Sequence, residues 1–146
     1  MKKVEEYCKQ RLASKAVVVS AQIESELVDL PEVEGKEYLA GLGVQESGVG
    51  ALIRATYELL GLRTYLTTGP KESRAWTIHA EDRAPQAAGV IHTDFERGFI
   101  AAETVAFADL KAAGTMAKVR EAGKLRVEGK EYVVQDGDVM EFRFNV

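Results

Sequence analysis

Apolar positions near the start of the chain recur with helical spacing and then close up into one short run. In KKVEEYCKQRL the apolar side chains return every three to four residues, which predicts an amphipathic helix over residues 2–13. The following run AVVVSA, residues 16–21, is apolar on both faces and too short for a helix. It therefore predicts a strand inside a sheet, with neighbours on both sides.

Two further helices are predicted before residue 62. Pro31 is well placed at the first turn of a helix over residues 32–41, which the glycines that follow can end. Ser47 can serve as the N-cap of the segment GVGALIRATYELL, and Gly61 ends that helix. The first sixty residues are thus predicted to form a helix, a strand and two more helices.

After Gly61 the pattern changes to short β-rich runs separated by turns, with one short helix among them. The helix is expected at residues 84–92, where Pro85 favours the first turn. A turn at Gly69-Pro70-Lys71 predicts a hairpin between the first two strands. The predicted strands are residues 62–68, 74–80, 100–107, 124–129, 130–135 and 138–146.

Together these elements predict an α+β chain in two parts, with a boundary at residues 60–62. Residues 1–61 form the helix-strand-helix-helix part, and residues 62–146 form a sheet wrapped on one helix. One strand cannot make a sheet, so the first part resembles the end of a larger α/β domain. Residues 62–146 are expected to be the stable unit, whereas the exposed valines of the first part need a covering partner.

Composition and charge narrow the classes of function. The chain has 146 residues, of which 46% are hydrophobic, so it can bury a core. A net charge of −4 argues against coating nucleic acid through bulk charge and leaves any RNA contact to a local patch. One cysteine and two histidines exclude an internal disulfide and a zinc site made of several such ligands. No apolar run reaches the length of a membrane span, so we expect a soluble cytoplasmic protein that binds neither membrane nor DNA.

The segment HTDFERG, residues 92–98, has two interpretations. An acid-base or metal site would use His92, Asp94 and Glu96, which alternate along an extended segment. The alternative is turn chemistry, in which His92 ends the preceding helix, Asp94 makes an Asx turn and Gly98 lets the chain enter the next strand. We favour the structural interpretation, because a metal would need a third strong ligand.

The sequence contains no phosphate site of the P-loop kind. Such a site needs G-x-x-x-x-G-K-[ST], whereas the Gly-Lys pairs of this chain continue as GKE, GKL and GKE. We therefore expect this chain alone to hydrolyse neither ATP nor GTP, and we predict no catalytic or metal-binding residue in it.

Basic residues in the second part provide a local signal for RNA. The stretch KVREAGKLR, residues 118–126, places four cations in nine residues near a turn, with Trp76 and Tyr132 as stacking surfaces. Most other cations of this part are expected on solvated faces. The candidate contacts to RNA or the ribosome are Arg74, Trp76, Lys118, Arg120, Lys124 and Arg126.

Four segments also carry a family resemblance: LIRATYELLGL, TYLTTGPKESRAWTI, APQAAGVIHTDFERGFIAAE and EAGKLRVEGKEYVVQDGDVMEFRFNV. Together they resemble the C-terminal third of the YchF-type, Obg-like P-loop nucleotidases. The resemblance implies that residues 62–146 form a TGS domain, which is a ubiquitin-like β-grasp module. It further implies that His92 and Asp94 belong to the turn after its helix. In the same way, Asp136, Gly137 and Asp138 would form the turn before its last strand.

By the same resemblance, residues 1–61 correspond to the end of a P-loop G domain, and VVVSAQIE to its last strand and the loop beside the nucleotide base. The resemblance implies contact with the nucleotide base only at Ser20, Ala21 and Gln22, since the P-loop and the base-specificity motif do not occur in this sequence. Intact members bind ATP or GTP with magnesium and are associated with ribosomes and translation.

Two functions remain open at this point. The resemblance implies a fragment that lies downstream of a nucleotidase domain and docks to the ribosome or RNA through its TGS surface. The alternative is a non-catalytic interaction or regulatory module that packs on a nucleotidase domain without touching RNA. The net negative charge favours the alternative, and the basic stretch at residues 118–126 favours RNA.

Overall fold

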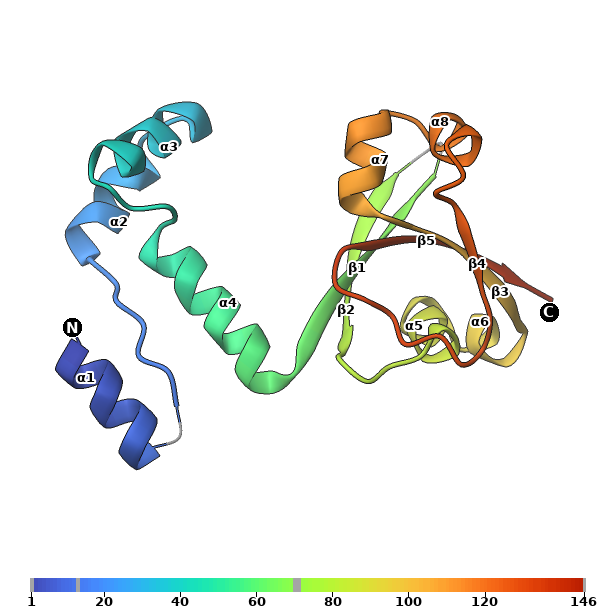
Figure 1. The fold of residues 1–146 in the computed structure, drawn as a ribbon, viewed down its shortest axis with the longest axis horizontal. Coiled ribbons are helices and arrows are strands. Elements are labelled where there is room, and N and C mark those ends of the chain that lie inside the picture. The colour runs from blue at the N-terminus through green and yellow to red at the C-terminus, as the bar shows by residue number, and fades with distance from the viewer. Residues whose placement is uncertain (1, 13, 70–71, 146) are drawn as a thin grey trace. The chain divides into compact units, whose positions relative to one another are not determined.

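The computed structural model describes residues 2–12, 14–69 and 72–145. The chain divides into two compact units, Met1–Leu60 and Gly61–Val146, which run from blue to green and from green to red in Figure 1. Two residues of the predicted hairpin turn, 70 and 71, lie outside the described residues, as do residues 13 and 146 at the ends of predicted elements.

The first unit is built from helices. Its elements are α1 (Lys2–Tyr7), the π-helical turn η1 (Cys8–Leu12), α2 (Ala21–Val28), α3 (Glu32–Gly41) and α4 (Gly48–Leu60). The helices predicted over 32–41 and after Ser47 are confirmed. The one predicted over 2–13 is helical over its described residues 2–12, as α1 followed by η1. Ser47 Oγ accepts a hydrogen bond from Gly50 N–H at 3.0 Å and thereby caps α4. Glu24 Oε1 accepts one from Gly48 N–H at 2.6 Å, which ties the start of α4 to α2.

The strand predicted over residues 16–21 is wrong. Residues 14–20 form neither helix nor strand, and α2 begins at Ala21 with Ser20 as its N-cap. A strand needs hydrogen-bonded neighbours, and no strand within the described ranges pairs with this run. Val18 and Val19 are 53% and 45% exposed, which fits an apolar run that no sheet covers.

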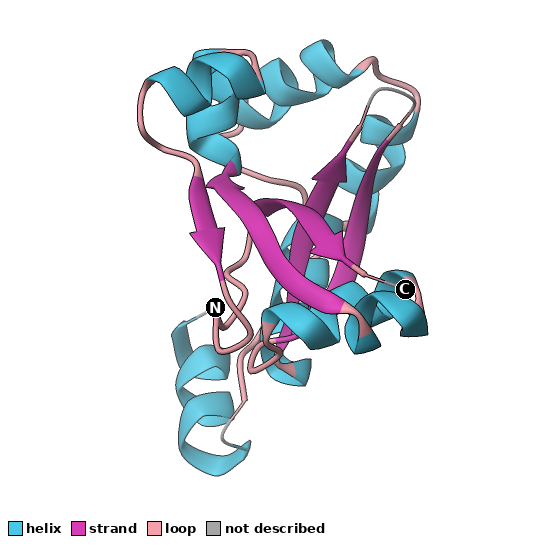
Figure 2. Cartoon of the chain, turned by 90° about the vertical axis from the view of Figure 1, so that its right-hand side faces the viewer, coloured by secondary structure: helices cyan, strands magenta, loops and turns pink. Residues whose placement is uncertain are grey.

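The second unit is an α+β fold around a mixed five-stranded sheet. Its strands are β1 (Leu62–Thr68), β2 (Ser73–His79), β3 (Phe99–Ala106), β4 (Arg126–Glu128) and β5 (Asp138–Phe144). Its helices are α5 (Ala84–Ile91), α6 (Thr93–Arg97), α7 (Phe107–Ala113) and α8 (Met116–Glu121). The strand order is β2-β1-β5-β3-β4, in which β1 and β5 run parallel and the other neighbours run antiparallel (Figures 1 and 2).

Most elements predicted for this unit are confirmed, and three features differ. The predicted strand over residues 130–135 is wrong, because this segment is a loop whose strand-like pairing is limited to one isolated β-bridge between Arg83 and Val133. The strand predicted over 124–129 shortens to the three residues of β4. Helices α6, α7 and α8 are not predicted, because five to seven residues are too few for a helical period to stand out.

Helices cover both faces of the sheet, and each of the two clusters includes residues of β1, β3 and β5. On one face, α5 packs its buried alanines against Tyr65 and Met140, and the Tyr65 hydroxyl donates to the Ala87 carbonyl at 2.8 Å. On the other face, α7 and α8 cover Val105 and Val139. Because side chains alternate along a strand, Glu141 and Arg143 of β5 lie on the same face as Val139, and both are exposed.

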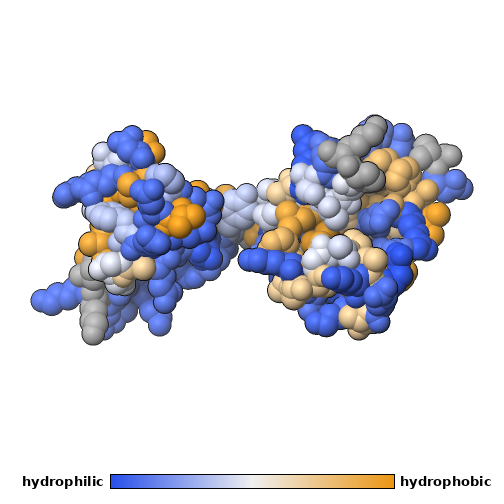
Figure 3. Space-filling model, turned by 90° about the horizontal axis from the view of Figure 1, so that it is seen from above, coloured by the Kyte–Doolittle hydropathy of each residue, from blue (hydrophilic) through white to orange (hydrophobic). Residues whose placement is uncertain are grey.

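The surface carries hydrophilic side chains over much of the view in Figure 3, with apolar residues between them. In the part of the chain that the structure describes, no helix combines the length and the apolar character needed to cross a membrane.

Candidate nucleic-acid interface

The six residues predicted to contact RNA fall into two groups, one on β2 and one on α8, β4 and the turn between them. Arg74 and Trp76 are on β2, which is one edge strand. The other four belong to α8, the turn after it and β4, which is the opposite edge strand. The structure therefore divides the predicted surface in two.

Carboxylates neutralise most cations of the group near α8 and β4. Arg120 Nη2 lies 3.0 Å from Glu103 Oε2, and Lys124 Nζ lies 2.5 Å from Asp109 Oδ1. Arg126 is paired with two acidic side chains, Asp138 at 3.1 Å and Glu128 at 3.4 Å. Among the described residues, Lys118 is the member of this group that forms no ion pair. The basic stretch is thus less available to phosphates than its sequence indicates.

Glu103 is the buried carboxylate behind this group. Its side chain is 8% exposed and lies between Arg143 on β5 and Arg120 on α8, to both of which it is hydrogen-bonded. The hydrogen bond from Arg143 is the main cause that lowers the pKa of Glu103, with Arg120 adding to it and burial opposing it. The folded state therefore favours the ionised form of Glu103. The stability that ionised Glu103 contributes is present above the pKa that this group has in the unfolded chain, and it is lost as the pH falls through its pKa in the folded chain.

Both aromatic residues predicted as stacking surfaces have an arginine over the ring. Arg74 Cζ lies 4.8 Å from the ring centroid of Trp76, and Arg126 Cζ lies 5.4 Å from that of Tyr132. These distances are in the range of cation–π contacts. An approaching base would therefore meet an arginine before it met either ring.

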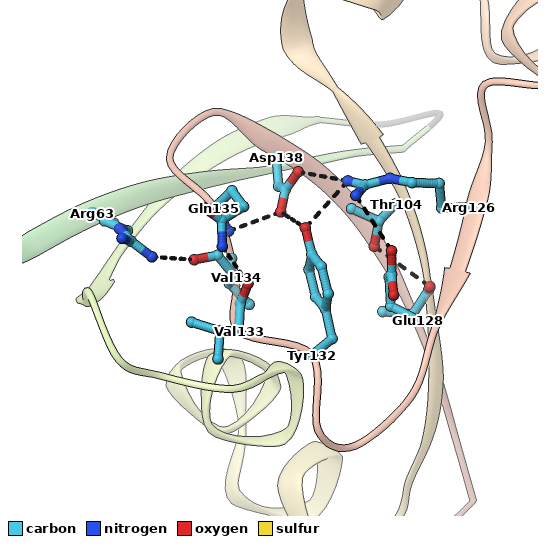
Figure 4. A network of polar contacts seen from close by, with 10 residues as sticks. Arg63, Thr104, Arg126, Glu128, Tyr132, Val133, Val134, Gln135 and Asp138 are labelled. Carbon is cyan, nitrogen blue, oxygen red and sulfur yellow. Dashed lines mark hydrogen bonds and ion pairs between the residues drawn. The ribbon is translucent and has the colours of Figure 1, made fainter.

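Asp138 is the centre of a polar network that holds the loop before β5 (Figure 4). Its side chain is 3% exposed and accepts hydrogen bonds from the Tyr132 hydroxyl at 2.6 Å, from Gln135 N–H at 2.9 Å and from Arg126 Nη2 at 3.1 Å. On the far side of the same loop, the Arg63 guanidinium donates to the Val134 carbonyl at 2.9 Å. The network links β4 and β5 through a loop that has no strand of its own.

The predicted turn at residues 136–138 precedes β5. Asp136 Oδ1 accepts from Thr64 N–H at 2.8 Å, and Gly137 N–H donates to the Thr64 carbonyl at 2.8 Å. Gly137 has a φ of 77°, which residues with a side chain rarely adopt. These contacts align the turn with β1, the strand that runs parallel to β5.

We expect the network to make the protein sensitive to alkaline pH. Burial, followed by the hydrogen bond to Asp138, raises the pKa of Tyr132 from 10.0 to about 12. In this interval the folded state keeps a proton that the unfolded state has lost, so the stability that Tyr132 contributes falls as the pH rises from about 10 to about 12.

Chemical denaturation at several pH values measures this effect, and Tyr132→Phe is the variant to compare. The loss of unfolding free energy across the interval should be smaller in Tyr132→Phe than in the unchanged chain. An equal loss in the two proteins would show that Tyr132 ionises as freely in the folded state as in the unfolded one.

The histidine-aspartate segment joins two helices and not a helix and a strand. His92 ends α5 and is also the N-cap of α6, where its Nδ1 accepts from Asp94 N–H at 3.2 Å. The Asp94 carboxylate lies 3.4 Å from the same nitrogen, and Gly98 is the C-cap of α6. In the described ranges, no group of three or more His, Cys, Asp and Glu side chains is arranged to hold a metal ion. The structural role of this segment stays a prediction.

The three residues that the family resemblance places beside the nucleotide base lie at the start of α2. Ser20 Oγ accepts from Ile23 N–H at 3.4 Å, and the Gln22 amide donates to Glu26 at 3.1 Å. Ala21 is the first residue of the helix. The two polar side chains are therefore used within α2, and their contact with a base stays a prediction.

Comparison with known proteins places the chain in a family. The family model YchF-GTPase_C, with the description "Protein of unknown function (DUF933)", matches residues 62–145. The chain belongs to the YchF family. It is 58% identical over 144 residues to the "Ribosome-binding ATPase YchF" of Bacillus subtilis, an alignment that covers 99% of this chain and 39% of that protein.

More distant members of the YchF family align over most of the chain. The "Obg-like ATPase 1" of Gallus gallus is 45% identical over 126 residues, which are 86% of this chain and 32% of that protein. The solved structure of the Schizosaccharomyces pombe YchF GTPase superposes with a TM-score of 0.80 at 35% identity, covering 97% of this chain and 38% of that one. The chain thus spans about two fifths of the length of the YchF proteins it matches.

Proposed function

We propose that the Gly61–Val146 unit is a TGS domain of the β-grasp type that docks to the ribosome and contacts its RNA. The observation that carries the proposal is the 58% identity, over 99% of the chain, to a protein named as a ribosome-binding ATPase. The strand order β2-β1-β5-β3-β4, with α5 packed on one face, supports the β-grasp assignment. Ribosome docking would place the protein in the cytoplasm and give it a part in translation.

The nucleotide chemistry named in the relatives would belong to an upstream nucleotidase domain. The sequence has no G-x-x-x-x-G-K-[ST] segment, so no lysine and hydroxyl are arranged here for a triphosphate and its magnesium. In the intact protein, ATP or GTP with magnesium would be bound beside the first unit, with Ser20, Ala21 and Gln22 flanking the base. This chain alone would turn over neither nucleotide.

Ion pairing indicates which cations of the second unit would contact phosphate. In the α8 and β4 group, three cations form ion pairs with Glu103, Asp109 and Asp138. Lys118 is the cation of that group that forms none among the described residues. Arg74 on the opposite edge likewise has no carboxylate partner within the described ranges. A docking surface with few unpaired cations predicts modest affinity with a measurable dependence on salt.

Co-sedimentation of the full chain with purified ribosomes tests the proposal. The chain should pellet with ribosomes at low salt. If it contacts two phosphates, raising the salt from about 50 to about 200 mM should weaken binding roughly tenfold. A chain that stays in the supernatant at the lowest salt would contradict ribosome docking.

A second candidate, a protein-interaction module that never touches RNA, is favoured by the net charge of −4 and by the paired cations. The same experiment separates the two functions. Binding to ribosomes whose strength does not change with salt would indicate contact with ribosomal protein through apolar or neutral surface.

A further inference from the structure

The geometry points to Arg74, held over Trp76 on strand β2, as a platform for one unpaired RNA base. This inference rests on the proposed ribosome docking and adds the class of ligand and the place where it binds. The base would stack on the exposed guanidinium of Arg74, while the tryptophan beneath keeps that guanidinium in position.

Trp76 is fixed from below and from the side. Its ring packs against the core cluster that contains Tyr65 and Ile78, and its Nε1–H donates to Thr67 Oγ1 on β1 at 2.9 Å. Arg74 lies two residues earlier on the same strand, so both side chains leave the same face of β2. These contacts hold the Trp76 ring in one orientation. The Arg74 guanidinium, 4.8 Å from the ring centroid, therefore has a fixed aromatic surface to pack on.

Arg74 also differs from most of the cations predicted to contact RNA in its charge environment. Arg120, Arg126 and Lys124 each have a carboxylate partner, whereas Arg74 is exposed and forms no ion pair within the described residues. Glu72 is the acidic residue closest to it along the chain, and among the described residues its carboxylate forms no ion pair with Arg74. The charge of Arg74 is therefore available to a ligand.

The chemistry of this pair favours an unpaired base over a duplex or a peptide. A planar guanidinium stacks on the flat face of a nucleobase and adds a positive charge for the neighbouring phosphate. In a duplex those faces are covered by the adjacent base pairs, so only single-stranded or looped RNA can use such a platform. β2 is an edge strand, and within the described residues no further strand of the sheet lies beyond it.

The test compares a short single-stranded uridine homopolymer with a duplex RNA of equal length, using the full chain. Fluorescence anisotropy of labelled RNA gives the two affinities, and Trp76, the chain's single tryptophan, reports binding through its own emission. Arg74→Lys keeps the charge and removes the planar group, so it should lower affinity for the single strand about tenfold and leave duplex binding unchanged. Trp76 itself is not replaced, because its ring is part of the core.

Lys118→Ala is the matched control, because it removes another exposed cation that forms no ion pair among the described residues, on α8 and not on β2. It should lower both affinities by a similar factor and leave the preference for the single strand intact. An Arg74→Lys variant that keeps the preference would overturn the inference, as would an unchanged chain that binds duplex as tightly as single strand. A chain that pellets with ribosomes but binds neither RNA would overturn the base platform and leave ribosome docking standing.

Discussion

Replacement of Gly98 by alanine is expected to destabilise the second unit by about 3 kcal/mol. A Cβ at this position would lie 1.9 Å from the Asn145 carbonyl oxygen and 2.9 Å from its carbon. Backbone atoms cannot rotate away as a side chain can, and Asn145 N–H also donates to the Gly98 carbonyl at 2.9 Å. The methyl group would therefore push the end of β5 away from the start of β3, next to the stacked rings of Phe95 and Phe144.

Chemical denaturation of the full chain, followed through Trp76, measures the effect of Gly98→Ala. Gly129→Ala is the matched control, because a Cβ at Gly129 would meet no atom within 4 Å, and its effect should stay within about 0.5 kcal/mol. Equal midpoints for the two variants would mean that the chain after Phe144 can leave residue 98 at no cost, contrary to the close contact in the structure.

Removal of the Asp138 carboxylate is the second change with a large expected effect. Asp138→Ala takes the acceptor from the Tyr132 hydroxyl, from Gln135 N–H and from Arg126, and the side chain that it removes is 3% exposed. Breaking a buried, hydrogen-bonded charge typically costs about 3 kcal/mol or more, because the partners remain without a substitute. Arg126 is half exposed and can turn to water, so we expect a loss of about 3 kcal/mol.

Asp138→Asn separates the charge from the hydrogen bonds. Asparagine keeps one acceptor oxygen at the same place, so its loss of unfolding free energy should be clearly smaller than that of Asp138→Ala. Both variants should reduce the protection of the loop before β5 against hydrogen exchange while α5 stays protected. A loss that is equal in the two variants would show that the charge, and not the pattern of acceptors, holds the network.

Local signals are sufficient to predict most of the helices and strands, and they fail where an element depends on distant partners. Ser47 and Gly61 bound α4 as their chemistry indicates. The valines of residues 17–19 have the composition of a strand, but composition supplies no neighbouring strand, and the run is left without regular structure. Gly114, at a φ of 80°, ends α7, and Thr115 caps the start of α8. Both are capping signals that the sequence itself contains.

The candidate interface is less predictable than the fold. Proximity along the sequence groups Lys118 with Arg126, although Lys118 lies on α8 and Arg126 on the edge strand β4. Whether a cation is free depends on carboxylates far along the chain, such as Glu103, which is buried and paired with Arg120. The contact of Arg74 with Trp76 is the exception, because residues two apart on a strand share a face and can meet.

Hydrogen–deuterium exchange of the full chain, with and without purified ribosomes, tests most directly whether the second unit is the docking surface. Docking through this unit predicts that ribosomes slow exchange in residues 61–146, most of all along Ser73–His79, which is an edge strand of the sheet in the part of the chain that the structure describes. Exchange in α4 should stay as it is in the free chain. Slowed exchange confined to residues 14–60, with no change in Ser73–His79, would contradict the account.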